Sequence, residues 1–135
     1  MSPSHIHVPT DCRTVTEILS RVGDKWSVQV VVQLGTGPKR FNELRRMVSG
    51  ISQRMLTLTL RGLERDGLVT RTVFPTIPPR VDYQLTGLGC SLLKTVRALG
   101  DWAIENRDEI LAARRRFDET EGSVQASARK ESEAA

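Results

Sequence analysis

The sequence has few of the side chains that most enzymes and metal sites use. Its 135 residues include only two histidines and two cysteines. Both histidines, His5 and His7, stand near the N-terminus, so neither cysteine has a histidine base in the rest of the chain. A site built from His5, His7 and Cys12 lacks a fourth ligand at zinc-like spacing, and a glycine-rich phosphate loop is missing. We therefore expect no enzyme, no metal and no cofactor.

Long apolar runs are also missing. The chain has no stretch of about 18 apolar residues, which a membrane span requires, and its N-terminus does not have the charged-then-apolar layout of a secretory signal. Two cysteines, Cys12 and Cys90, are too few for a disulfide framework, and each is expected to be a thiol in a reducing compartment. These absences favour a cytoplasmic protein of one domain with no membrane segment.

The positive charge is concentrated in one part of the chain. Residues 13–80 contain twelve Lys and Arg against five Asp and Glu, whereas residues 81–135 contain eight against ten. A basic segment suits the phosphate backbone of double-stranded DNA, whose counterions are released on binding. An acidic protein partner fits this charge bias equally well.

Helical spacing begins after a short arm. Residues 1–10 show little periodicity and are expected to be mobile. From Cys12 a helix with an apolar stripe is predicted up to Gly23. Asp24 then fits an N-cap, and residues 26–34 are apolar nearly all round, which predicts the central core helix.

The next two predicted helices form a helix-turn-helix pattern. Residues 39–48 give a short helix, and the break at Ser49 and Gly50 leads into a second helix that starts near Ser52. On this second helix, Leu56, Leu60 and Leu63 recur at helical spacing and are expected in the core. The opposite face has side chains that suit base edges and phosphates: Arg54, Thr57, Arg61 and Arg65. Ser52 and Gln53 stand at the helix N-terminus, where phosphates also bind. Seen alone, such a face also fits a solvated surface.

The period changes after Gly67. A β-branched run over 68–74, a proline-rich tip at 75–79 and an alternating run over 81–85 predict a two-stranded hairpin. A hairpin directly after the second helix of a helix-turn-helix is a wing. From it, Arg80 could reach a minor groove or a phosphate.

The last predicted helix is too long for its own domain. Thr86 fits its N-cap, and apolar residues recur in a seam: Leu92, Val96, Leu99, Ala103, Ile110 and Phe117. About 30 residues at 1.5 Å each give roughly 45 Å, so a second chain is expected to bury part of the seam. The alternative is a shorter helix that packs wholly on its own domain. From Asp118 onward few large apolar residues remain, and a disordered tail is expected over 118–135.

Five segments in this order resemble the HxlR-type winged-helix transcriptional regulators, which are related to the MarR group. They are GDKWS at 23–27, RFNELRR at 40–46, GISQRMLT at 50–57, LERDGLV at 63–69 and PPRVDYQLT at 78–86. The resemblance spans residues 12 to about 110. Arg13 after Cys12, Gly62 and Gly87 depart from the common pattern of the family.

The resemblance implies a homodimer that binds a pseudo-palindromic DNA operator. It places the first and last helices at the dimer interface and the helix from Ser52 in the major groove. It also implies an N-terminal cysteine, matched by Cys12, that in some members senses electrophiles or oxidants. The neighbouring Arg13 and the helix dipole favour a thiolate there, but a packing cysteine gives the same pattern. Cys90 is expected to be a small buried residue.

Together these expectations define a mainly α fold with a small β-hairpin, a winged helix-turn-helix at residues 11–117. The predicted DNA-binding residues come from the two helices and the wing: Lys39, Arg40, Arg45, Ser52, Gln53, Arg54, Thr57, Arg61 and Arg80. If the protein has a small apolar effector, its site is expected between the first and final helices. The alternative function is a winged-helix module that binds protein instead of DNA.

Overall fold

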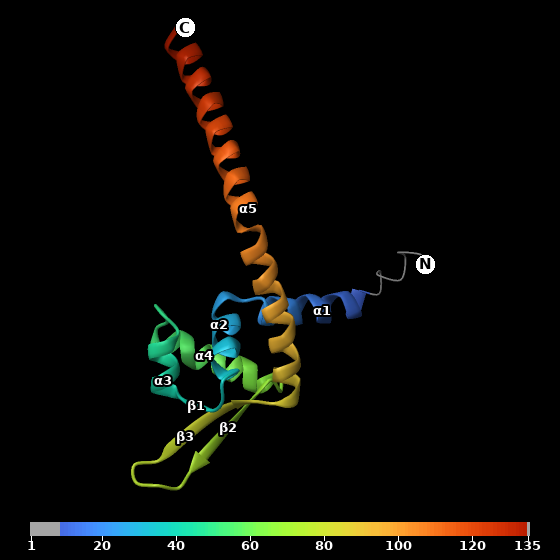
Figure 1. Ribbon diagram of the computed structural model, residues 1–135, viewed down its shortest axis with the longest axis vertical. Helices are drawn as coiled ribbons and strands as arrows, with labels where there is room; N and C mark the ends of the chain where they lie inside the picture. The colour runs from blue at the N-terminus through green and yellow to red at the C-terminus, as the bar shows by residue number, and fades with distance from the viewer. Residues whose placement is uncertain (1–8, 135) are drawn as a thin grey trace. The chain divides into compact units, whose positions relative to one another are not determined.

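The computed structural model describes residues 9–134, which form five helices and three strands in that range (Figure 1). In chain order these are α1 (Pro9–Val22), α2 (Lys25–Leu34), β1 (Lys39–Arg40), α3 (Phe41–Met47), α4 (Gln53–Arg65), β2 (Val69–Phe74), β3 (Arg80–Leu85) and α5 (Gly87–Ala134). The described chain divides after Arg97 into two compact units. The first unit contains the winged helix-turn-helix, so the predicted fold class is confirmed.

The core of the first unit lies between α2, α3 and α4. Val30 and Val31 of α2 are fully buried, as are Leu56 and Leu63 of α4 and Leu44 of α3. The predicted central helix and the inward leucine face are therefore confirmed. Asp24 begins α2, because its carboxylate accepts the backbone N–H groups of Trp26 and Ser27 at 3.1 and 3.2 Å.

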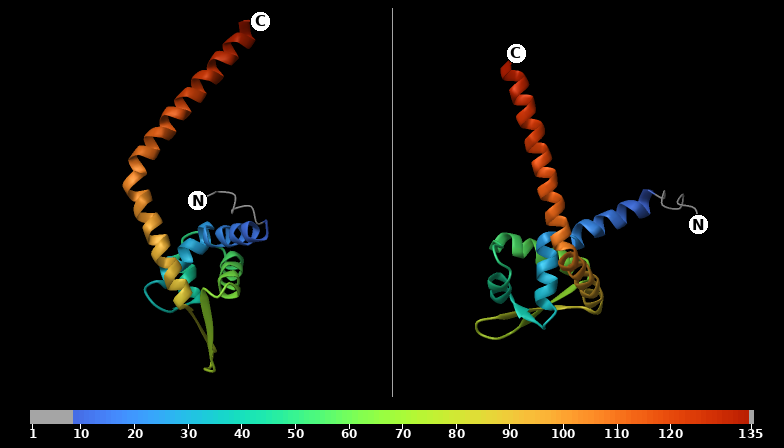
Figure 2. Two further views of the ribbon diagram at one scale, coloured as in Figure 1. Left: turned by 90° about the vertical axis from the view of Figure 1, so that its right-hand side faces the viewer. Right: turned by 45° about the horizontal axis from the view of Figure 1, so that its top comes forward.

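The sheet has three antiparallel strands in the order β1-β3-β2. β2 and β3 form the expected hairpin, with Val69 opposite Leu85 and Phe74 opposite Arg80. Figures 1 and 2 show this wing projecting beyond α2, α3 and α4. The third strand was not predicted, and residues 39–40 were assigned to a helix instead. β1 has only two residues, so no local alternation indicates it, and its pairing with β3 decides its conformation.

The first helix begins earlier than predicted. α1 starts at Pro9, because proline fits the first helical turn without losing a helix hydrogen bond. The rest of the predicted arm, residues 1–8, lies outside the described residues. Val15, Ile18 and Leu19 are 52–61 % exposed, so the apolar stripe of α1 is largely uncovered in the single chain.

The second unit consists of the remainder of α5, from Ala98 onward. The disordered tail expected from Asp118 is helical in the structure up to Ala134. Residues 118–134 contain no proline and many good helix formers, such as Glu, Ala, Arg and Lys. All side chains described from Asp118 to Glu133 are exposed, so this stretch is helical without tertiary packing. Leu99, Trp102 and Phe117 are also more than half exposed.

Candidate nucleic-acid interface

The outer face of α4 is fully available at the surface of the first unit. Arg54, Thr57, Arg61 and Arg65 are all exposed, on the side opposite the buried leucines. Thr57 Oγ1 donates to the Gln53 carbonyl at 2.9 Å, so its proton is used within the helix and its methyl group remains for apolar contact. The sequence therefore identified both faces of this helix.

The N-terminus of α4 is closed by its own cap. Ser52 Oγ accepts the Met55 backbone N–H at 3.0 Å. The Gln53 side chain is exposed and takes no part in this cap. Ser52 therefore stabilises the start of the helix, and its hydroxyl proton can still be donated outward.

The basic residues before and within α3 are not equivalent. Arg40 and Arg45 are exposed, and the Arg40 backbone N–H donates to Glu43 Oε1 at 3.0 Å, which closes the start of α3. Lys39 is half-buried instead. Its Nζ donates to Thr36 Oγ1 at 2.9 Å and to the Gly37 carbonyl at 3.2 Å, so two of its three donors bind the preceding loop.

Arg80 on the wing is held by two neighbours. Its Nε and Nη2 donate to Asp82 Oδ1 and Oδ2 at 3.0 and 2.8 Å, and its guanidinium lies 5.1 Å from the centre of the Phe74 ring. The hydrogen bonds from Arg80 lower the pKa of Asp82 below its ordinary 3.8, and Asp82 raises the pKa of Arg80. A carboxyl whose pKa is lowered in the folded state stabilises that state above its unfolded pKa, and the effect is lost as pH falls through the lowered value. The pair is thus fully ionised at neutral pH.

Two clefts bring basic residues from different elements together. A cleft of about 1160 Å³ between α3 and the tip of the wing is lined by Arg40, Arg46 and Arg80, among others. A second, of about 410 Å³, lies between α4 and the hairpin and is lined by Thr57, Arg61, Arg71 and Tyr83. Sequence reasoning did not select Arg71 or Asp82. Strand alternation could have found both, because Asp82 shares a face with Arg80 and Arg71 lies opposite Tyr83.

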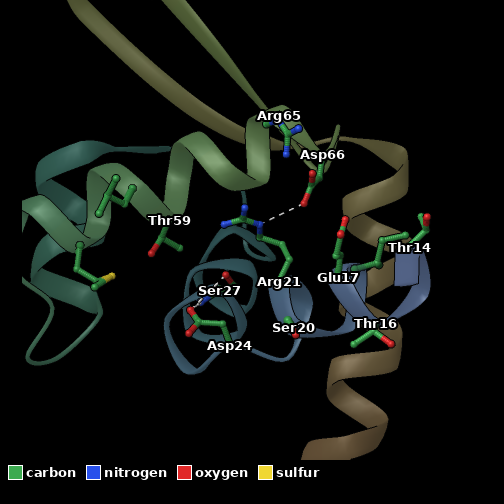
Figure 3. Close-up of a pocket in the computed structure, with 13 residues that line it drawn as sticks. Thr14, Thr16, Glu17, Ser20, Arg21, Asp24, Ser27, Thr59, Arg65 and Asp66 are labelled. Carbon is green, nitrogen blue, oxygen red and sulfur yellow. Dashed lines mark hydrogen bonds and ion pairs between the residues drawn. The ribbon is translucent and has the colours of Figure 1, made fainter. Parts of the chain in front are cut away.

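A third cleft, of about 750 Å³, separates α1 from α4 and the start of α2 (Figure 3). The Arg21 side chain crosses it, with Nε 3.3 Å from Asp66 Oδ2. The Arg21 guanidinium covers Gly62 so closely that a Cβ at this position would clash with it. A side chain at this buried position of α4 would therefore require the end of the Arg21 side chain to shift.

The two cysteines lie in different surroundings. Cys12 is half-buried in the first turn of α1, and its carbonyl accepts Thr16 Oγ1 at 2.7 Å. Neither Cys12 nor Cys90 is in a disulfide. The prediction that Cys90 is buried was wrong. On α5 the neighbouring Gly89 and Leu93 face the core, which turns Cys90 outward.

The part of the chain that the structure describes contains no group of three His, Cys, Asp or Glu side chains that could hold a metal ion. His5 and His7 lie outside that part. Over the same residues, no helix combines the length and hydrophobicity needed to cross a bilayer.

Comparisons with known proteins agree with this geometry. The family model described as HxlR-like helix-turn-helix matches residues 21–111. YtfH of Escherichia coli K12, named an uncharacterized HTH-type transcriptional regulator, is 43 % identical over 98 residues, which cover 73 % of this chain and 78 % of YtfH.

Two solved structures are also similar. The redox regulator HypR in its reduced form is 42 % identical, with a TM-score of 0.68 over 73 % of this chain and 98 % of HypR. The reduced transcriptional regulator YodB from Bacillus subtilis is 32 % identical, with a TM-score of 0.60 over 76 % of this chain and 91 % of YodB.

Proposed function

Because the chain belongs to the HxlR-like helix-turn-helix family and is a transcriptional regulator of the helix-turn-helix type, we propose that it binds specific DNA as a homodimer. The proposed operator is a pseudo-palindrome in double-stranded DNA, with half-sites about one helical turn apart. The relatives are named as regulators and not as enzymes, which supports a role without catalysis. The proposed location is the cytoplasm.

The observation that supports this function best is the two-faced α4. Its inner leucines fix the helix in the core, and its outer arginines stand clear of the domain. We assign base readout to the middle of this outer face, Arg54, Thr57 and Arg61, with Ser52 and Gln53 at a phosphate. The remaining proposed contacts are phosphate anchors on β1, α3 and the wing: Lys39, Arg40, Arg45 and Arg80. Two of the three Lys39 donors bind the preceding loop, so one remains for a phosphate.

The dimer is supported by apolar side chains that the single chain leaves uncovered. In the first unit these include Ile18 and Leu19 of α1, and in the second unit Leu99 and Trp102 of α5. Exposed apolar patches of this kind mark association surfaces. We therefore assign α1 and α5 to the interface between two copies.

We propose two kinds of chemical signal that would regulate DNA binding. One is modification of Cys12 by an electrophile or oxidant, which the redox regulator HypR among the similar structures supports. The other is a small apolar effector. A cleft of about 470 Å³ between α1 and the first turns of α5, lined by Ile18, Val22, Leu68, Leu88 and Leu92, has a suitable lining.

The test is DNA binding by the purified protein across a salt series. Genomic fragments selected by the protein supply the specific DNA, and random duplex supplies the comparison. We expect tight binding to the selected fragments and a steep loss of affinity for both DNAs as salt rises. Binding to neither DNA would instead support the alternative, a winged-helix module with a protein partner.

A further inference from the structure

The guanidinium of Arg80 is unusually constrained for a side chain on a projecting hairpin. Arg80 and Asp82 are two residues apart on β3 and so share one face of the strand. Phe74 is the direct partner of Arg80 on β2, which places its ring on the same face. The carboxylate therefore holds the guanidinium from one side, while the ring supports it at 5.1 Å.

Asp82 is well placed for this task because it is itself largely enclosed. Its side chain is only 15 % exposed, against 47 % for Arg80. Asp82 also lies opposite Arg40 of β1, whose charge further lowers its pKa. The carboxylate is thus a fixed acceptor inside the wing, and the guanidinium is the outer member of the pair.

The pair leaves the guanidinium able to bind a second group. An arginine has five N–H donors in a rigid fork, and Asp82 uses two of them. The other three remain for phosphate or groove acceptors. Arg80 also lines the cleft that contains Arg40 and Arg46, so those donors lie on a basic surface.

We propose that Asp82 is a positioning residue for DNA binding, one that orders Arg80 on the wing before the duplex arrives. The inference rests on the proposed function. A free arginine side chain loses rotamer entropy when it is fixed, and a side chain already ordered in the free protein loses less on binding. The acidic residue therefore favours binding to a polyanion through its effect on Arg80.

This role predicts a result opposite in sign to simple electrostatics. An acidic side chain on a surface that faces DNA repels the phosphates, so its neutralisation should tighten binding. If Asp82 instead orders Arg80, its neutralisation should weaken binding. A third role is that Asp82 competes with the phosphates for Arg80. That role also predicts tighter binding without the carboxylate, so weaker binding by Asp82→Asn excludes it as well.

The experiment compares the wild type with Asp82→Asn, Arg80→Ala and the double variant, on selected operator fragments at fixed salt. We expect Asp82→Asn to bind about threefold to thirtyfold more weakly. In the Arg80→Ala background the same change should have no weakening effect, because Asp82 acts through Arg80. Glu64→Gln is the charge-matched control on α4. The Glu64 carboxylate makes no ion pair among the described residues, so its loss should leave binding equal or slightly tighter.

Equal or tighter binding by Asp82→Asn would overturn the positioning role, and so would equal weakening in both backgrounds. A wild type that binds no DNA would instead remove the proposed function itself. If Asp82→Asn does not fold, NMR relaxation of the Arg80 Nε–H group in the wild type decides the question. An ordered Arg80 supports the proposal, whereas mobility equal to that of Arg61 on α4 contradicts it.

Discussion

The arginines of the first unit differ in how far the fold constrains them. Arg21 forms an ion pair with Asp66 inside a cleft, and Arg80 is held by Asp82 and Phe74 on the wing. Among the described residues, Arg54 and Arg61 make no side-chain hydrogen bond or ion pair. Arg80 can offer its three remaining donors to a phosphate, whereas the whole guanidinium of Arg54 or Arg61 is available for a base edge.

Arg54→Ala should therefore affect sequence preference more than Arg80→Ala does. We expect Arg54→Ala to lose about 1–3 kcal/mol of binding free energy on the operator and to reduce the discrimination between operator and random duplex. Arg80→Ala should weaken both DNAs alike and lower the salt slope by about one for each lost phosphate contact. Affinities for both DNAs over a salt series measure these effects. Equal losses on operator and random DNA for both variants would disprove the division between base readout and phosphate anchoring.

At this scale the sequence predicted exposure better than it predicted partners. The helical period placed Leu56, Leu60 and Leu63 inside and Arg54 and Arg61 outside, since burial follows directly from spacing along one helix. It did not predict the Lys39 contacts with its loop or the Arg80–Asp82 pair. Such pairs depend on rotamers and on backbone geometry, which periodicity does not encode.

At the scale of elements, α1 and α4 are linked through an unusual contact. The guanidinium of Arg21 lies against Gly62. It also forms an ion pair with Asp66, just beyond the end of α4 (Figure 3). Gly62 leaves room for the guanidinium at a helical position where glycine itself is unfavourable.

Gly62→Ala should consequently fail to stabilise the protein. In an ordinary helix the change from Gly to Ala gains about 1 kcal/mol, but here the methyl group would displace Arg21 from Asp66. In an Arg21→Ala background the space is empty, and Gly62→Ala should then gain about 1 kcal/mol. Urea unfolding at one fixed protein concentration measures both changes, because oligomers unfold in a concentration-dependent way. If Gly62→Ala gains about 1 kcal/mol of stability while Arg21 is present, the methyl group does not displace Arg21 from Asp66.

Element boundaries show where sequence patterns were insufficient. The winged helix-turn-helix order followed from periodicity and turn residues, since each long element has its own period. Periodicity and turn residues do not predict β1 or the early start of α1. A two-residue strand has no period, and Pro9 fits a helix start as well as a loop. The helix beyond Asp118 was missed for a related reason. Low hydrophobicity over 118–134 favours disorder, although many of the same residues are good helix formers.

At the scale of the whole molecule, the exposed apolar residues predict a dimer. The chain has a mass of 15.1 kDa, so sedimentation at micromolar concentration should show a species of about twice that mass. Trp102→Lys should shift the equilibrium toward the single chain, because Trp102 is 55 % exposed and a charge there would be costly to bury. Ala126→Lys is a control on the same helix, at an exposed position that lies off the predicted seam and off its heptad continuation. A wild-type species of 15 kDa alone would exclude the dimer.

In the proposed dimer, a modification at Cys12 would affect DNA binding through the spacing of the two subunits. Cys12 lies in the first turn of α1, the helix assigned to the interface, and α1 contacts α4 through Arg21. A bulky adduct or a disulfide between subunits would change the separation of the two α4 helices. A two-site binder loses about tenfold in affinity for each 1.4 kcal/mol of misfit, so a small displacement is sufficient.

We therefore expect an oxidant such as diamide, or a quinone, to weaken operator binding by at least about tenfold in the wild type. Cys12→Ser should not respond. Because Cys90 is exposed and can react as well, the comparison needs Cys90→Ser as a second variant, which should respond like the wild type. Non-reducing electrophoresis of the treated proteins distinguishes a disulfide between subunits from an adduct on one chain. If Cys12→Ser loses affinity as strongly as the wild type does, Cys12 is a packing residue and the response comes from elsewhere in the chain.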